Sequence, residues 1–123
     1  MTIKTVSVAP EYLSFYIAGV HKITVPLDHD RVGIVATDQC INVGCLYWND
    51  GDTTITLGPF DELPPQKTLP RFDRMLDTPE YRVVISDAIT PDMLTMAVPS
   101  VHTRVRIWTN HKTEPDDVII ALG

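Results

Sequence analysis

The sequence predicts an all-β fold, an antiparallel β-sandwich or flattened barrel of about nine or ten short strands. Three observations support this prediction. Large apolar residues fall on every second position in many short segments, turn residues separate these segments at fairly regular spacing, and only one segment has helical spacing. The chain has 123 residues, of which 44% are hydrophobic, and shows no repeat or linker. We therefore expect a single domain, 1–123, with a core of its own.

In the first half of the chain, the alternation is clearest at Leu13, Phe15 and Ile17. Strands are expected at residues 3–8, 12–18, 21–25, 32–37, 41–48 and 53–57. The last two flank Asn49-Asp50-Gly51-Asp52, whose Asp-Gly pair tolerates positive φ, so we expect them to form a hairpin. One face of the 41–48 strand should carry Ile41, Val43, Cys45 and Tyr47, and the other Asn42, Gly44, Leu46 and Trp48.

The 58–80 segment interrupts this pattern with five prolines, at positions 59, 64, 65, 70 and 79. Within it, Leu69, Phe72 and Leu76 recur at helical spacing. Thr68 is a suitable N-cap, and Pro70 is tolerated in a first turn. The segment is therefore predicted to contain one short helix lying across the sandwich. The remainder would be a loop, either a lid over one open end or a long crossover between sheets.

Alternation resumes in the last third of the chain, where strands are expected at 81–87, 94–98, 104–110 and 118–122. Pro99 and Ser100 open a turn between the middle two, which suggests a hairpin. In the 104–110 strand, Val105 and Ile107 should face the core together with Leu94, Met96 and Val98. Arg104, Arg106 and Trp108 should then face outward.

The overall charge limits the classes of partner. The formal net charge is −6 and the pI is near 4.9, which disfavours a nucleic-acid partner, because binding to a phosphate backbone uses clustered Lys and Arg. No apolar run approaches the roughly 20 residues that span a bilayer, and the N-terminus lacks the apolar block of a secretory signal. In an extended strand, Cys40 and Cys45 would lie about 16 Å apart, so both are expected as reduced thiols. Together these features favour a cytoplasmic protein without a membrane partner.

Known catalytic motifs are not recognisable in the sequence, which has no Gly-rich phosphate loop, nucleophile elbow or paired-cysteine knuckle. We therefore expect no enzymatic activity and no cofactor. The spacings between His21, His29, His102 and His111 do not predict convergence on a metal ion, and a turn accounts for the acidic residues around Gly51. A metal site is accordingly not expected.

Candidate binding residues come from two groups. Trp and Arg are enriched in protein-binding hot spots, so Trp48, Arg104, Arg106 and Trp108 are candidates for a partner-binding face. The alternative is that the 58–80 segment covers one or both tryptophans. The second group comprises the acidic loop residues, which could meet a basic partner or simply be solvated: Asp61, Glu62, Glu114, Asp116 and Asp117.

From Val35 to Leu122 the pattern resembles the competence protein J group. The matching features are a strand ending in Trp-Asn-Asp-Gly-Asp at 48–52, the segments Leu94–Pro99 and Arg104–Thr109, and a last strand at Val118–Ile120. Members of that group are small acidic bacterial β-sandwich proteins that bind and inhibit a DNA-entry nuclease. The resemblance implies a similar fold and a similar role, and it transfers no functional residue.

The expected function is therefore that of a non-enzymatic protein-binding module. It would be a bacterial inhibitor or immunity protein that neutralises a basic nuclease or toxin. One alternative is a ligand-binding or enzymatic β-sandwich that takes a small ligand or carbohydrate at a site under the 58–80 loop. Another is a structural component of a phage or secretion system, for which self-association is expected.

Overall fold

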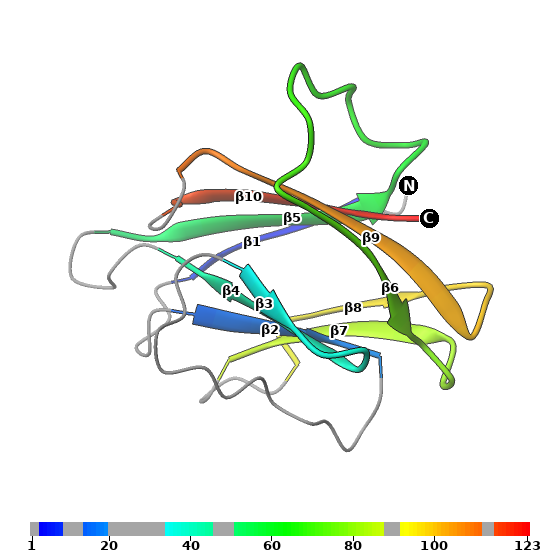
Figure 1. The fold of residues 1–123 in the computed structure, drawn as a ribbon. Coiled ribbons are helices and arrows are strands. Elements are labelled where there is room, and N and C mark those ends of the chain that lie inside the picture. Colours follow the sequence, from blue (N-terminus) through cyan, green and yellow to red (C-terminus); the bar gives the residue numbers. More distant parts are fainter. Residues whose placement is uncertain (1–2, 9–13, 20–33, 46–50, 88–91, 112–114) are drawn as a thin grey trace.

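In the computed structural model, the chain forms two five-stranded sheets that pack face to face (Figure 1). The structure describes residues 3–8, 14–19, 34–45, 51–87, 92–111 and 115–123. The first sheet has the spatial order β1 (Lys4–Val8), β5 (Thr53–Pro59), β10 (Asp117–Leu122), β9 (His102–Thr109) and β6 (Phe72–Asp77). The second has the order β3 (Ile34–Ala36), β4 (Cys40–Gly44), β2 (Ser14–Ala18), β7 (Arg82–Ser86) and β8 (Leu94–Ala97). This arrangement confirms the predicted all-β sandwich.

The core lies between the sheets and is built from alternate residues of their strands. On β9, Val105 and Ile107 are fully buried, as predicted, and Met96 and Val98 reach the same core from the β8 segment. Burial of each such side chain contributes about 1.5–3 kcal/mol to the stability of the fold. The largest fully buried side chains are Phe15, Ile17, Ile41, Ile55, Leu57, Leu76, Ile85, Ile107, Ile120, Val43, Val83 and Val105.

Both predicted hairpins are wrong, although their strands exist. β4 belongs to the second sheet and β5 to the first, and the same separation holds for β8 and β9. Two consecutive strands present the same alternation whether they pair side by side or face each other across the core. The turn residues between them suit either connection, so the sequence pattern identified the strands and not their partners.

The helix predicted within 58–80 is also wrong. Residues 72–77 form β6, which pairs antiparallel with β9 from Phe72 opposite Ile107 to Asp77 opposite His102. Phe72 and Leu76 are four residues apart, an even number, so they share a face of a strand as readily as a face of a helix. Leu69, the third member of the supposed helical stripe, is 89% exposed. Pairing with β9 and burial of Leu76 therefore outweigh a weak helical propensity.

Residues 60–71 connect β5 to β6 within the first sheet, passing over its outer side beyond β10 and β9 (Figure 1). This connection is the predicted long crossover, but it joins two strands of one sheet instead of two sheets. β5 also forms a parallel pair with β10, with Ile55 opposite Val118, whereas an antiparallel sandwich was expected. The expected strand at 21–25 lies outside the described residues.

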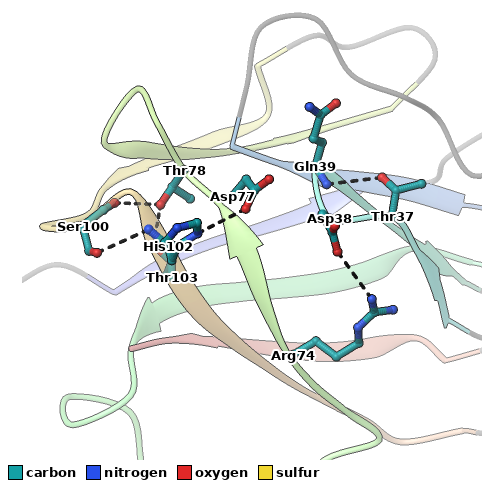
Figure 2. A network of polar contacts seen from close by, with 9 residues as sticks. All are labelled: Thr37, Asp38, Gln39, Arg74, Asp77, Thr78, Ser100, His102 and Thr103. Atoms are coloured by element: carbon teal, nitrogen blue, oxygen red, sulfur yellow. Dashed lines mark hydrogen bonds and ion pairs between the residues drawn. The ribbon is translucent and has the colours of Figure 1, made fainter.

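One end of the sandwich is closed by a polar network that ties the two sheets together (Figure 2). The buried hydroxyl of Thr78, directly after β6, donates to the carbonyl of Ser100 at 2.7 Å and lies 2.8 Å from the hydroxyl of Thr103. The backbone N–H of Asp77 donates to the carbonyl of Asp38, in the turn between β3 and β4, at 2.8 Å. The end of β6 is thus attached to the second sheet.

Candidate functional site

The outer face of the first sheet carries the predicted row Arg104, Arg106 and Trp108 on β9. The alternation of β9 that buries Val105 and Ile107 sends these three side chains outward. Neighbouring strands place other side chains beside them on the same face. Asp73 of β6 and Ala121 of β10 lie opposite Arg106, and Ile119 of β10 lies opposite Trp108.

The Arg104 side chain is engaged by a carboxylate. Its Nε and Nη2 atoms donate to Oδ1 and Oδ2 of Asp73 at 2.8 and 2.7 Å, a bidentate pair on the solvent side of the sheet. The hydrogen bonds from Arg104 hold the pKa of the Asp73 carboxyl below its usual value, and the same bonds raise the pKa of Arg104. Arg104 therefore adds little net positive charge to this face.

Arg106 is held differently, although it lies only two residues along the strand. Its guanidinium lies 3.3 Å from the centroid of the Phe60 ring, a cation–π contact, and its Nη2 donates to the carbonyl of Gly123. The Nε atom is buried without a hydrogen-bond partner. Burial, followed by the nearby charge of Arg104, lowers the pKa of this guanidinium from its ordinary value. Arg106 thus anchors the start of the 60–71 segment.

Trp108 is half-buried, because the 60–71 segment lies against it. Its indole Nε1–H donates to the carbonyl of Thr68 at 2.8 Å. Its ring stacks with Phe60, with ring centroids 6.4 Å apart and an interplanar angle of 22°. Of the two arrangements that the sequence left open, the structure shows the one in which the 58–80 segment partly covers this tryptophan.

A cleft of about 360 Å³ opens between residues 60–66 and the sheet. Its floor consists of the half-buried Trp108 of β9 and Ile119 of β10, with Ala121 of β10 fully buried at its base. Its wall is supplied by the loop, through Phe60, Asp61, Leu63, Pro64, Pro65 and Gln66. A mostly apolar lining with a few polar groups, in a volume of this order, is typical of sites that bind a small molecule or a projecting side chain.

The acidic candidates are divided among different surroundings. Asp61 lines the cleft and Glu62 is exposed beside it. Asp117 is exposed and lies two residues before Ile119, on the same outward side of β10. The Asp116 carboxylate accepts a hydrogen bond from the side-chain amide of Asn110, so it also serves to close the turn before β10. Glu114 and Trp48 lie outside the described residues.

Several cleft residues were not among the sequence candidates, notably Phe60, Leu63, Gln66, Ile119 and Ala121. For Ile119 and Ala121 on β10, the sequence did contain an indication. Residues 118–122 form an uninterrupted apolar run, which is typical of a strand covered on both faces. Nothing local indicates Phe60 or Gln66, because their place in the cleft depends on the path of the whole crossover.

Among the residues that the structure describes, the other titratable groups do not assemble into a site. His102 pairs with Asp77 through Nδ1 and Oδ1 at 3.2 Å (Figure 2), and His111 is exposed. Within the described ranges, no three metal-ligating side chains lie together. Cys40 and Cys45 are buried free thiols, and burial raises the pKa of each to about 11. The described part of the chain contains no helix long and apolar enough to cross a membrane.

Comparisons with known proteins give one informative match. No family model matches the chain, and no curated protein matches it in sequence. The structure is similar to the crystal structure of ComJ, an inhibitor of the DNA-degrading activity of NucA, from Bacillus subtilis. The TM-score is 0.68, with 15% identity, over 97% of this chain and 93% of that chain. The resemblance to the competence protein J group is therefore confirmed as a likeness of fold.

Proposed function

We propose that this protein is a non-catalytic inhibitor that binds a DNA-degrading nuclease. The observation that supports the proposal most strongly is the fold match to ComJ, which extends over nearly the full length of both chains. A fold alone is a weak guide to function, so the surface must also suit such a partner. The proposed binding face is the outer side of the first sheet, around Trp108 and the cleft.

The charge of the chain suits a nuclease partner. Nucleases bind a phosphate backbone through clustered Lys and Arg, and this protein carries a formal net charge of −6. Opposite charges accelerate encounter and disfavour wrong partners. On the proposed face, Arg104 is already paired with Asp73, whereas Asp61 and Asp117 present carboxylates to solvent.

The test is an inhibition assay with purified proteins. Where the genome encodes a nuclease beside this gene, that nuclease is expressed, and its degradation of plasmid DNA is followed with increasing amounts of this protein. We expect DNA degradation to stop near a one-to-one ratio and to resume as salt is raised, because screening weakens the contact. Complete degradation at a large excess of this protein, with no complex by calorimetry, would contradict the proposal.

A second candidate function is favoured by one observation, the cleft itself. It lies under the 58–80 segment, where a small-ligand or carbohydrate site was expected, and it combines two aromatic rings with Asp61 and Gln66. Thermal-shift screens with sugars and small amphipathic compounds test this candidate. A melting temperature that rises with ligand concentration, and fails to rise in an Ala121→Leu variant, would support it over the inhibitor.

A further inference from the structure

We propose that the cleft beneath residues 60–66 receives one aromatic or long aliphatic side chain of the nuclease, flanked in its own chain by Lys or Arg. This inference rests on the proposed inhibitor function and adds to it the chemistry of the partner segment. The occupant is thus a protein side chain that projects from the partner, next to basic residues. Three features of the cleft specify this side chain and its neighbours: the apolar floor, the preformed wall and the negative charge at the Asp61 rim.

The apolar floor determines what enters. Trp108, Ile119 and Ala121 form a surface without a charged group, and Leu63 and two prolines face it from the loop. An aromatic side chain buries about 150–250 Å² on docking, and a Trp surface loses little conformational entropy when it is covered. The volume of about 360 Å³ accommodates one large side chain but not a folded element of a partner.

The wall of the cleft is formed before any partner arrives. The Phe60 N–H donates to the carbonyl of Leu122 at 3.0 Å, which fixes the loop to the end of β10. At the other end, the indole of Trp108 donates to Thr68, and between them the Gln66 side-chain amide donates to the Pro64 carbonyl at 2.9 Å. A loop held in place in this way loses little entropy on binding, which favours affinity.

The charges around the cleft select basic neighbours for the occupant. Asp61 is the only charged side chain among the lining residues. Asp117 lies about 7 Å from Ile119 along β10, on the same side of the strand. Arg104 is neutralised by Asp73, whereas Arg106 keeps its positive charge under the Phe60 ring and is not among the lining residues. Arg71, whose Nε donates to the carbonyl of Thr109 at 3.4 Å, brings positive charge to the Asp117 end, since Thr109 lies opposite Val118. A partner segment therefore meets apolar surface in the middle of the cleft and negative charge at the rim formed by Asp61 and the exposed Glu62.

The inhibition assay tests the inference with paired variants. Ala121→Leu adds bulk at the fully buried base of the cleft, and Thr5→Leu controls for an added apolar side chain at an exposed position of β1, at the far edge of the same sheet. Asp61→Lys reverses the charge at the rim, and Asp92→Lys makes the same change at an exposed position before β8. We expect Ala121→Leu and Asp61→Lys each to weaken inhibition by about tenfold or more, with both control variants close to the original protein. Melting curves identify any variant that has lost its fold.

A peptide titration tests the cleft without the nuclease. The indole resonance of Trp108, assigned with a Trp108→Phe variant, is followed by NMR during addition of the capped tripeptides Lys-Phe-Lys, Lys-Ser-Lys and Glu-Phe-Glu at millimolar concentration. We expect Lys-Phe-Lys to shift this resonance most, and Ala121→Leu to abolish the shift. Equal effects of all three peptides, or none, would overturn the inference.

The two experiments separate the inference from the proposed function. Nuclease inhibition that Ala121→Leu and Asp61→Lys leave intact would remove the cleft from the interface and leave the inhibitor function standing. A selective Lys-Phe-Lys response in a protein that inhibits no nuclease would support the chemistry of the cleft and overturn the proposed function.

Discussion

At the scale of single residues, two arginines on one face of one strand have opposite surroundings. Arg104 forms an exposed bidentate pair with Asp73, whereas Arg106 lies against the Phe60 ring with its Nε buried and unpartnered. Leaving a buried donor without a partner costs stability, which the cation–π contact and the bond to Gly123 offset. The same residue type thus balances charge at one position and anchors a loop at the other.

The Arg104–Asp73 pair gives a prediction about pH. Because the pKa of Asp73 is lower in the folded protein, stabilisation by the pair is present above the ordinary Asp pKa and is lost as pH falls through the lowered value. Arg104→Gln should raise the pKa of Asp73 toward the ordinary value of about 3.9. Carboxyl ¹³C NMR titration measures the pKa of Asp73. Arg74→Gln is the control, because Arg74 pairs with Asp38, and an unchanged midpoint in Arg104→Gln would contradict the assignment.

The buried hydroxyl of Thr78 gives a second prediction at this scale. Thr78→Val leaves the Ser100 carbonyl and the Thr103 hydroxyl without this partner, so it should lower the free energy of unfolding by about 1–3 kcal/mol. Urea denaturation measures the loss. Adding Thr103→Val should cost less than the sum of the two single changes, since the second change removes a group already left unpaired. Strict additivity would argue against the network.

At the scale of secondary-structure elements, the sequence predicted which segments are strands more accurately than it predicted their neighbours. Alternation identifies the strand and its buried face, as Val105 and Ile107 show. It does not identify the partner, because pairing is decided by contacts between residues far apart in the chain. A second ambiguity concerns the type of element, as the supposed helix at Leu69, Phe72 and Leu76 shows. A spacing of four residues, as between Phe72 and Leu76, fits the period of a strand as well as that of a helix.

The connection between β6 and β7 contains a residue in a strained backbone conformation. Tyr81 adopts φ of 58°, in the left-handed region that suits glycine, and its side chain is 54% exposed. Tyr81→Gly should raise the free energy of unfolding by about 1 kcal/mol, because a left-handed conformation costs a non-glycine residue roughly that amount. Thermal unfolding measures the change. The β-branched Tyr81→Val should instead lower stability, and a lower stability for Tyr81→Gly would show that the ring contributes more than the strain costs.

At the scale of the whole molecule, the two sheets come into close contact where Gly19 follows β2. A Cβ atom added at Gly19 would lie 2.1 Å from the carbonyl oxygen of Asp77, which belongs to the other sheet. Gly19→Ala should therefore force the sheets apart at this end and cost about 3 kcal/mol or more. At Gly58, an added Cβ would meet only side chains, those of Ile3 at 3.0 Å and Leu63 at 3.3 Å.

Gly58→Ala is accordingly the matched control, because side chains can move where a backbone carbonyl cannot. Its loss of stability in chemical denaturation should be clearly smaller than that of Gly19→Ala. Similar losses for the two variants would mean that the sheets can separate at Asp77 at little cost in free energy.

The candidate site was predictable only in part, for a reason that belongs to the whole molecule. The outward row on β9 followed from local alternation, and Asp61 and Asp117 were found as acidic loop residues. The cleft itself requires the crossover to return over β10 and β9, which brings Phe60 to Trp108 across 48 positions of sequence (108 − 60). Single-sequence periodicity contains no information about such a return.

The position of β10 has a consequence for the order of events in folding. β10 lies between β5 and β9, so two strands that precede it in the chain have no common partner until it arrives. During synthesis on the ribosome, the centre of the first sheet is thus completed only by β10. Until then, β5 and β9 each have one unpaired edge. Such edges are prone to pair with other chains, and closing contacts over this separation is slow. Folding of the first sheet is therefore expected to be cooperative and to follow the synthesis of β10, so the floor of the cleft is among the last parts to form.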